Sequence, residues 1–251
     1  MEGPSRVPVS CLAVKHGADS DKPALFSISD GTAIHNNGGA DIPGLTNDNA
    51  WVTPQGWILV RSESDAATFL QNPQDPDDKI HLPHLPHSLS SHCMCVISGK
   101  PRRGDCVVLL VEPDDDDDAR FLWYCLLGGE DWARHEYDIG TQPDIRPGKE
   151  GLREKVPICN IAACRGKFYF NGTTETVGEL EFTPTPMFSS IAIADPLPGG
   201  YGVLGVAKVF LVESDGELYM QWHGVEEIDG RAFLLASGFG ASRPADSELR
   251  H

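Results

Sequence analysis

A run of histidine and cysteine side chains is the part of this chain whose residue types could most directly do chemistry. Three histidines stand at every third position of HLPHLPH, and a His-Cys pair and one more cysteine follow them. Imidazole and thiolate are common zinc ligands. The prolines, however, favour an extended backbone in which the three rings do not converge, and no CxxC pair is present. We therefore predict a loop, and no metal site, for His81, His84, His87, His92, Cys93 and Cys95.

The acidic run EPDDDDD is a second candidate, because Asp114 to Asp118 are consecutive carboxylates. A calcium loop spaces its ligands, turns at a glycine and ends on a bidentate glutamate. None of these features is present here, so we predict a solvated loop. The sequence also lacks the GxSxG, HExxH and GxxxxGKS/T patterns of nucleophile, zinc-protease and phosphate sites. We expect a non-enzymatic chain that uses no cofactor.

Tryptophans are candidates for a binding surface, because exposed indoles often anchor protein interfaces. Trp51 and Trp132 stand beside loop residues, and we predict that they bind a partner together with His84 and His87. The alternative for both indoles is packing between sheets. For the other three tryptophans, Trp57, Trp123 and Trp222, packing is the favoured interpretation because they lie inside apolar runs.

The composition excludes several classes of partner. The chain has 251 residues with 37 acidic and 20 basic side chains, giving a formal charge of −17. Such a surface repels phosphate backbones and anionic membranes, so we expect neither nucleic acid nor membrane as a partner. The number of cysteines, 7, is odd, and most lie in apolar runs, which favours buried free thiols in a reducing compartment. Without a secretory signal at the start, we expect an intracellular protein, in cytoplasm or nucleus.

The elements that must position these residues are short strands. Strand-like segments begin at Gly56 (GWILV), Cys106 (CVVLLV), Lys167 (KFYFNG) and Val209 (VFLVESDGELYMQ), and their spacing of about 40 to 60 residues is typical of propeller blades. Other apolar runs fill the intervals, and Asp215-Gly216 predicts a two-residue hairpin turn. The segment FLQNP followed by QDPDDKIHLP is predicted to be a strand that leads into a turn.

We therefore predict an all-β fold, a β-propeller with kelch-like blades of four antiparallel strands. The strand candidates suffice for about four blades, and residues 1–251 would form one domain. Two segments, CVVLLV and VPICNIAAC, are apolar on both faces, which indicates strands packed between neighbouring blades.

The order of these segments resembles that of the plant F-box-associated proteins with a KIB-type β-propeller. The resemblance rests on GWILV, FLQNP and KIHLPHLP, then DCVVLLVEP and FLWYCLLGGEDWARHE, then CRGKFYFNGTTETVGELEF, and lastly VFLVESDGELYMQ. Members of that family usually begin with an F-box, which docks a Skp-type adaptor of a ubiquitin ligase. Here the propeller pattern starts by Pro8, so we expect no F-box and no Skp-type adaptor. Members also continue beyond the segment RAFLLASGFGAS, so an incomplete ring is expected.

The resemblance implies a recognition module that binds a protein partner through its blade loops. A chain without an F-box could bind a target without delivering it for ubiquitination. The alternative is a propeller enzyme or carbohydrate-binding protein with a ligand on the central axis, where Trp51, Trp132 and acids from several blades would line the pocket.

Overall fold

The structure is a computed structural model of the chain, and its described part consists entirely of strands, turns and loops. It describes residues 49–62, 66–73, 75–85, 89–90, 92–101, 104, 106–113, 119–144, 148–149, 151–173, 175–183, 185–194 and 209–221, together with strands at 11–14, 24–27, 32–34, 231–236 and 239–244. The acidic run at 114–118 lies outside these described residues.

Three four-stranded antiparallel sheets form the centre of the described fold, and we name them blades I, II and III. Blade I contains β4 (Ala50–Val52), β5 (Ile58–Arg61), β6 (Thr68–Asn72) and β7 (Asp75–Leu82). Blade II contains β8 (Met94–Ile97), β9 (Val107–Val111), β10 (Arg120–Leu126) and β11 (Ala133–Tyr137). Blade III contains β14 (Ala162–Cys164), β15 (Lys167–Phe170), β16 (Thr176–Phe182) and β17 (Pro186–Ala192).

The remaining strands form smaller antiparallel sheets. A three-stranded sheet contains β1 (Cys11–Val14), β2 (Ala24–Ser27) and β3 (Thr32–Ile34). A hairpin of β12 (Thr141–Pro143) and β13 (Arg153–Lys155) separates blade II from blade III along the chain. Two further hairpins, β18 (Phe210–Ser214) with β19 (Glu217–Gln221) and β20 (Arg231–Ala236) with β21 (Phe239–Pro244), follow blade III, and β18 lies alongside β21.

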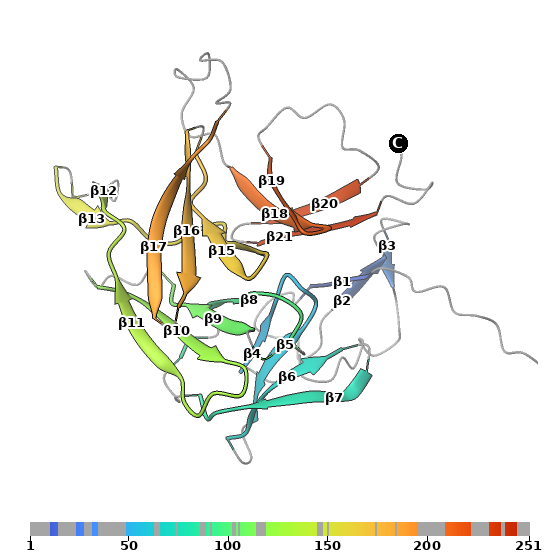
Figure 1. Ribbon diagram of the computed structural model, residues 1–251. Coiled ribbons are helices and arrows are strands. Elements are labelled where there is room, and N and C mark those ends of the chain that lie inside the picture. The colour runs from blue at the N-terminus through green and yellow to red at the C-terminus, as the bar shows by residue number, and fades with distance from the viewer. Residues whose placement is uncertain are drawn as a thin grey trace, which may run out of the picture.

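The blades follow one another around a common centre, as Figure 1 shows from blue to red. Each blade meets the next through its first strand, because β4 contacts β8, β8 contacts β14, and β14 contacts β18 and β19. Four-stranded antiparallel sheets arranged radially in chain order define a β-propeller. The predicted fold class is therefore confirmed.

The second strand of blade II, β9, has no solvent-exposed face, because apolar side chains pack on both sides of it. All five residues of β9 are buried, and their side chains alternate between two clusters. Val108 and Leu110 face blade I in a cluster that we name the I/II core, whereas Leu109 and Val111 face blade III in the II/III core. The doubly apolar run CVVLLV is thus a strand packed between blades, as predicted.

Turn chemistry closes the hairpin of β18 and β19. Asp215 and Gly216 have φ angles of 53° and 77°, and positive values at both central residues are typical of the two-residue turn that matches strand twist. The Gly216 N–H also donates to a carboxylate oxygen of Glu213 at 2.7 Å. The predicted hairpin is confirmed.

The structure differs from the sequence prediction in the segment after FLQNP. Residues 75–82 form the eight-residue strand β7 and not a turn, with Ile80 opposite Leu70. The aspartates of this segment are typical of a turn, but β7 is an outer strand on which Asp75 and Asp77 are exposed. The four segments of the predicted repeat also do not occupy equivalent positions in their sheets. GWILV, CVVLLV and KFYF contain the second strands of their blades, whereas VFLVES contains β18, the first strand of its hairpin.

Truncation of Leu109 tests the packing of blade II between its neighbours. Leu109 is 0% exposed, so Leu109→Ala is expected to lower the free energy of unfolding by about 2–5 kcal/mol through lost transfer energy and a residual cavity. Urea denaturation measures this change. Leu152, 58% exposed on the β12–β13 hairpin, is the matched control, and Leu152→Ala should stay within about 0.5 kcal/mol. Equal effects at the two positions would contradict the arrangement.

Candidate functional site

The two tryptophans that the sequence proposed for partner binding lie in the interior of the seam between blades I and II. Trp51, on β4, is 3% exposed, and Trp132, just before β11, is 9% exposed; both belong to the I/II core. The indole N–H of Trp51 donates to the Ser90 carbonyl at 3.1 Å, and that of Trp132 donates to the Pro83 carbonyl at 3.0 Å. Packing between blades, the alternative interpretation, describes their geometry, and neither indole offers an exposed anchor.

These hydrogen bonds hold both ends of the segment that connects blade I to blade II. Between them, Leu85 is buried in the I/II core and its N–H donates to the Thr68 hydroxyl at 3.0 Å. His84 is exposed, and its Nδ1 lies 2.8 Å from the Ala66 carbonyl oxygen. His87 lies outside the described residues. A partner-binding role for His84 and His87 stays a prediction.

The residues weighed as zinc ligands lie in different surroundings. His81 is exposed on β7 with its ring edge-on to Phe69, whereas Cys93 and Cys95 belong to the I/II core. Among the described residues, no group of three or more His, Cys, Asp or Glu side chains is arranged to hold a metal. Nor does the described part of the chain contain a helix that could cross a membrane.

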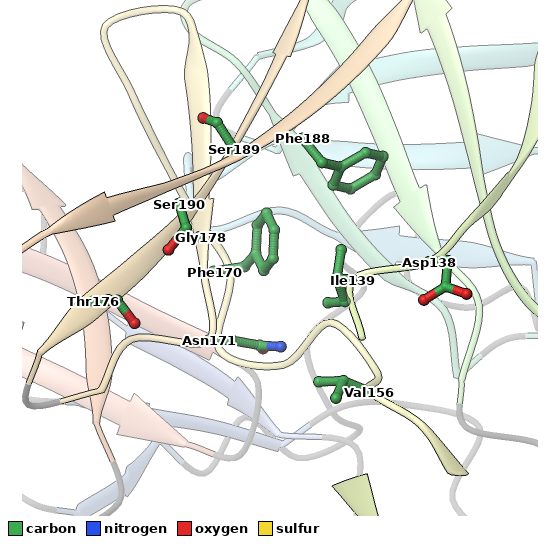
Figure 2. A pocket seen from close by; sticks show the side chains of 10 residues that line it. All are labelled: Asp138, Ile139, Val156, Phe170, Asn171, Thr176, Gly178, Phe188, Ser189 and Ser190. Atoms are coloured by element: carbon green, nitrogen blue, oxygen red, sulfur yellow. The ribbon is translucent and has the colours of Figure 1, made fainter. Parts of the chain in front are cut away.

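The candidate site is a hollow between blades II and III that the sequence did not indicate, and we name it the II/III groove. Its volume is about 400 Å³. Its apolar walls come from Ile139 and Val156, which flank the β12–β13 hairpin, and from Phe170 and Phe188 of blade III. Polar groups and one glycine complete its lining, which adds Asp138, Asn171, Thr176, Gly178, Ser189 and Ser190. Figure 2 shows these side chains around the hollow.

A glycine in the middle of β16 makes room for the aromatic wall. Gly178 pairs directly with Phe170 across the sheet. A Cβ atom at Gly178 would stand only 2.4 Å from Cε2 of Phe170, so the ring lies flat over the glycine. Glycine inside a strand commonly marks such a close approach, and this was the one signal in the sequence that could have indicated the groove.

Stacked rings extend the aromatic wall towards blade II. Phe188 meets Phe170 edge-on at 6.1 Å between ring centroids, and it stacks on Tyr137 at 5.8 Å and on His135 at 6.2 Å. The Tyr137 hydroxyl accepts a hydrogen bond from the Ile158 N–H at 3.1 Å. Rings from blades II and III therefore fix the width of the groove.

Asn171 ties the floor of the groove to the chain that enters blade III. It has a φ of 47°, a left-handed conformation that asparagine tolerates. Its side-chain oxygen accepts from the Cys159 N–H at 2.6 Å, and its amide nitrogen donates to the Pro157 carbonyl at 2.8 Å. Because both polar ends of Asn171 are used within the fold, it holds the groove in shape.

The polar groups that line the groove are three hydroxyls, one amide and one carboxylate. Asp138 supplies the single carboxylate of the lining; it accepts the Gly140 N–H at 3.0 Å and lies 3.9 Å from the Lys155 ammonium. Hydroxyls and one carboxylate around aromatic walls suit the recognition of an apolar side chain with neighbouring polar atoms.

The fold and this seam define the protein as a β-propeller whose blades leave a groove at their rim. A family model described as the KIB1-4 beta-propeller matches residues 25–231, so the chain belongs to that family. No curated protein and no solved structure matches the chain.

Gly178→Ala tests the aromatic wall. The added methyl group must displace the Phe170 ring, and overpacking of this kind lowers the free energy of unfolding by about 1–3 kcal/mol. A smaller side chain at Phe170 should relieve the clash, so Gly178→Ala/Phe170→Leu is expected to be less destabilised than the sum of the two single variants. Urea denaturation of all three proteins measures the coupling, and strictly additive effects would show that the ring does not rest on Gly178.

The thiols make a prediction that peptide mapping can check. Burial, with the Asp131 carboxylate as a smaller contribution, raises the pKa of Cys125 to about 11, and burial also raises the pKa of Cys95. At pH 8 a thiol of pKa about 11 is ionised in about one molecule in a thousand. Iodoacetamide is therefore expected to label the exposed Cys159 in the native protein and to spare Cys95 and Cys125. All three should react after denaturation, and rapid native labelling of Cys125 would contradict its burial.

Proposed function

We propose that this propeller is a non-enzymatic recognition module that binds a protein partner, and that the II/III groove is part of its binding surface. The observation that carries the proposal is the lining of the groove, where aromatic walls meet hydroxyl groups and a single carboxylate. Interfaces take most of their affinity from apolar anchors seated in such hollows, with polar atoms at the rim.

The architecture supports this proposal, because the walls of the groove are positioned by the cores of two blades. Phe188 and Tyr137 both pack on the II/III core, so the surface is already formed before a partner arrives. Preorganisation lowers the entropic cost of binding. The fold alone does not determine what a propeller does, because its function depends on the site that its blades carry.

The alternative, an enzyme or carbohydrate-binding propeller, required Trp51 and Trp132 to line a central pocket. Both indoles are instead buried in the I/II core, and their N–H groups donate hydrogen bonds to backbone carbonyls. Stacking of a sugar needs an open indole face, so no observation favours this second function.

A capture experiment tests the proposal through a variant that fills the groove. Ser190 is exposed at the rim and is not a member of the II/III core, so Ser190→Trp adds bulk to the groove without removing a core side chain. We expect the tagged chain to recover a specific protein from plant extract and Ser190→Trp to reduce that recovery at least about tenfold. Quantitative mass spectrometry of the captured proteins is the measurement.

Val52→Trp is the matched control, because Val52 is 49% exposed on β4 and does not line the groove. If Val52→Trp abolishes recovery of the partner and Ser190→Trp does not, the binding surface lies away from the groove. Recovery of chaperones only would contradict a recognition function for the isolated propeller, and stoichiometric recovery of a Skp-type adaptor would show that the chain enters a ubiquitin ligase directly.

A further inference from the structure

The outermost strands of the three blades differ in charge. β7 carries Asp75, Asp77, Asp78 and Lys79 within DPDDKIHL, and β11 carries Arg134 and Glu136 within ARHEY. β17, of sequence PMFSSIA, carries no charged side chain. Charged residues on an outer strand discourage the pairing of another chain, so β17 lacks a protection that the other two outer strands possess.

The free edge of β17 exposes backbone groups as well as apolar side chains. Among the described strands it pairs only with β16. The Ile193 N–H donates to the Glu175 carbonyl at 2.8 Å, which continues the register that sets Ile191 opposite Val177. Because bonded pairs alternate along an antiparallel ladder, Ser190 and its second neighbours direct their N–H and C=O groups away from β16. Met187 and Ile191 are 47% and 39% exposed beside this edge.

The II/III groove lies on one face of the same strand. Phe188 and Ser190 point to that face, because side chains two positions apart in a strand share a side, and both line the groove. Figure 2 shows Phe188 and Ser190 on the strand that borders the hollow. A strand added to the edge of β17 would therefore direct every second side chain towards the groove.

The net charge distinguishes a partner from a second copy of this chain. Each copy carries a formal charge of −17, so two copies that approach edge to edge repel one another. An edge without charges inside an acidic molecule suits a segment whose centre is uncharged and whose flanks are basic.

We propose that the edge of β17 is a strand-addition site. An extended segment of the partner protein pairs with the outward backbone groups of Phe188, Ser190 and Ala192, and its alternate apolar side chains enter the II/III groove. The segment has an uncharged centre with lysine or arginine on both sides. This inference rests on the proposed function, and it adds the conformation and chemistry of the bound segment.

The first test uses defined peptides on the wild-type chain. The probes are short lysine-flanked peptides in which threonine alternates with valine, isoleucine or phenylalanine, and fluorescence anisotropy measures their affinity. Two N-methylated forms of the best binder, methylated on one or the other alternate set of amides, separate backbone pairing from groove binding. The form methylated on the amides that face β17 should bind at least about tenfold more weakly, because its backbone can no longer donate to the strand. The form methylated on the amides that face away should retain its affinity. Equal binding of both forms, or no binding by any probe, would overturn strand addition.

The second test uses Ser190→Pro. Proline removes an N–H that faces away from β16 and is tolerated on outer strands, so the fold should persist while the peptide binds at least about tenfold more weakly. Ser190→Lys, which keeps the N–H but adds a positive charge at the rim, is expected to weaken the lysine-flanked probe in the same direction. Unchanged affinity in both variants would overturn the inference.

Two further outcomes separate this inference from the function on which it rests. If Ser190→Pro leaves the recovery of a captured partner unchanged, the proposed recognition function stands and the strand-addition site is overturned. If the chain alone sediments as a dimer that Ser190→Pro dissociates, a second copy occupies the edge and the partner segment does not.

Discussion

The physical constraint on which this structure depends is that a strand packed between two neighbouring blades has no solvent face. In blade II the side chains of β9 alternate between two apolar clusters, and all five residues are buried. A polar residue on either face would lose its hydration without a partner, which is costly. Water-facing chemistry is therefore confined to connecting loops, to outer strands and to seams where neighbouring blades fail to fill the space between them.

The two seams of blade II meet this constraint in different ways. Between blades I and II, Trp51 and Trp132 fill the space, and each indole N–H finds a backbone carbonyl in the segment that joins the blades. A buried indole needs such an acceptor, so the same two residues close the seam and hold the connection. Between blades II and III the rings of Phe170 and Phe188 meet edge-on and leave a hollow at the rim.

The sequence predicted most strands because apolar runs and turn residues are local signals. The hairpin at Asp215-Gly216 depends on two adjacent residues, and the doubly buried β9 depends on five. The prediction failed for β7, where the aspartates that indicate a turn in one context stand on an outer strand in another. Single-strand propensity cannot distinguish these cases, because strand preference depends largely on what the neighbouring strands bury.

The candidate site was missed for a related reason. Its walls come from Ile139 and Val156 on either side of the β12–β13 hairpin and from Phe188 on β17, and only the packing of two blades brings them together. The tryptophans were misplaced because a residue beside a loop can face either water or a neighbouring blade, and alternation along one strand does not show which face is covered. Gly178 was the one local signal of the groove, because a side chain at this position would collide with the ring of Phe170.

The uncharged outer strand and the open seam are best understood together. An unprotected strand edge favours aggregation, and natural proteins usually blunt it with charge, as β7 and β11 do here. At β17 a lysine or glutamate at Ser190 would also stand in the lining of the groove, which includes Phe188. At this position, charge that protects the edge therefore conflicts with an uncharged groove lining. The formal charge of −17 permits the unblunted edge, because repulsion between copies limits self-association without placing a charge on β17 itself.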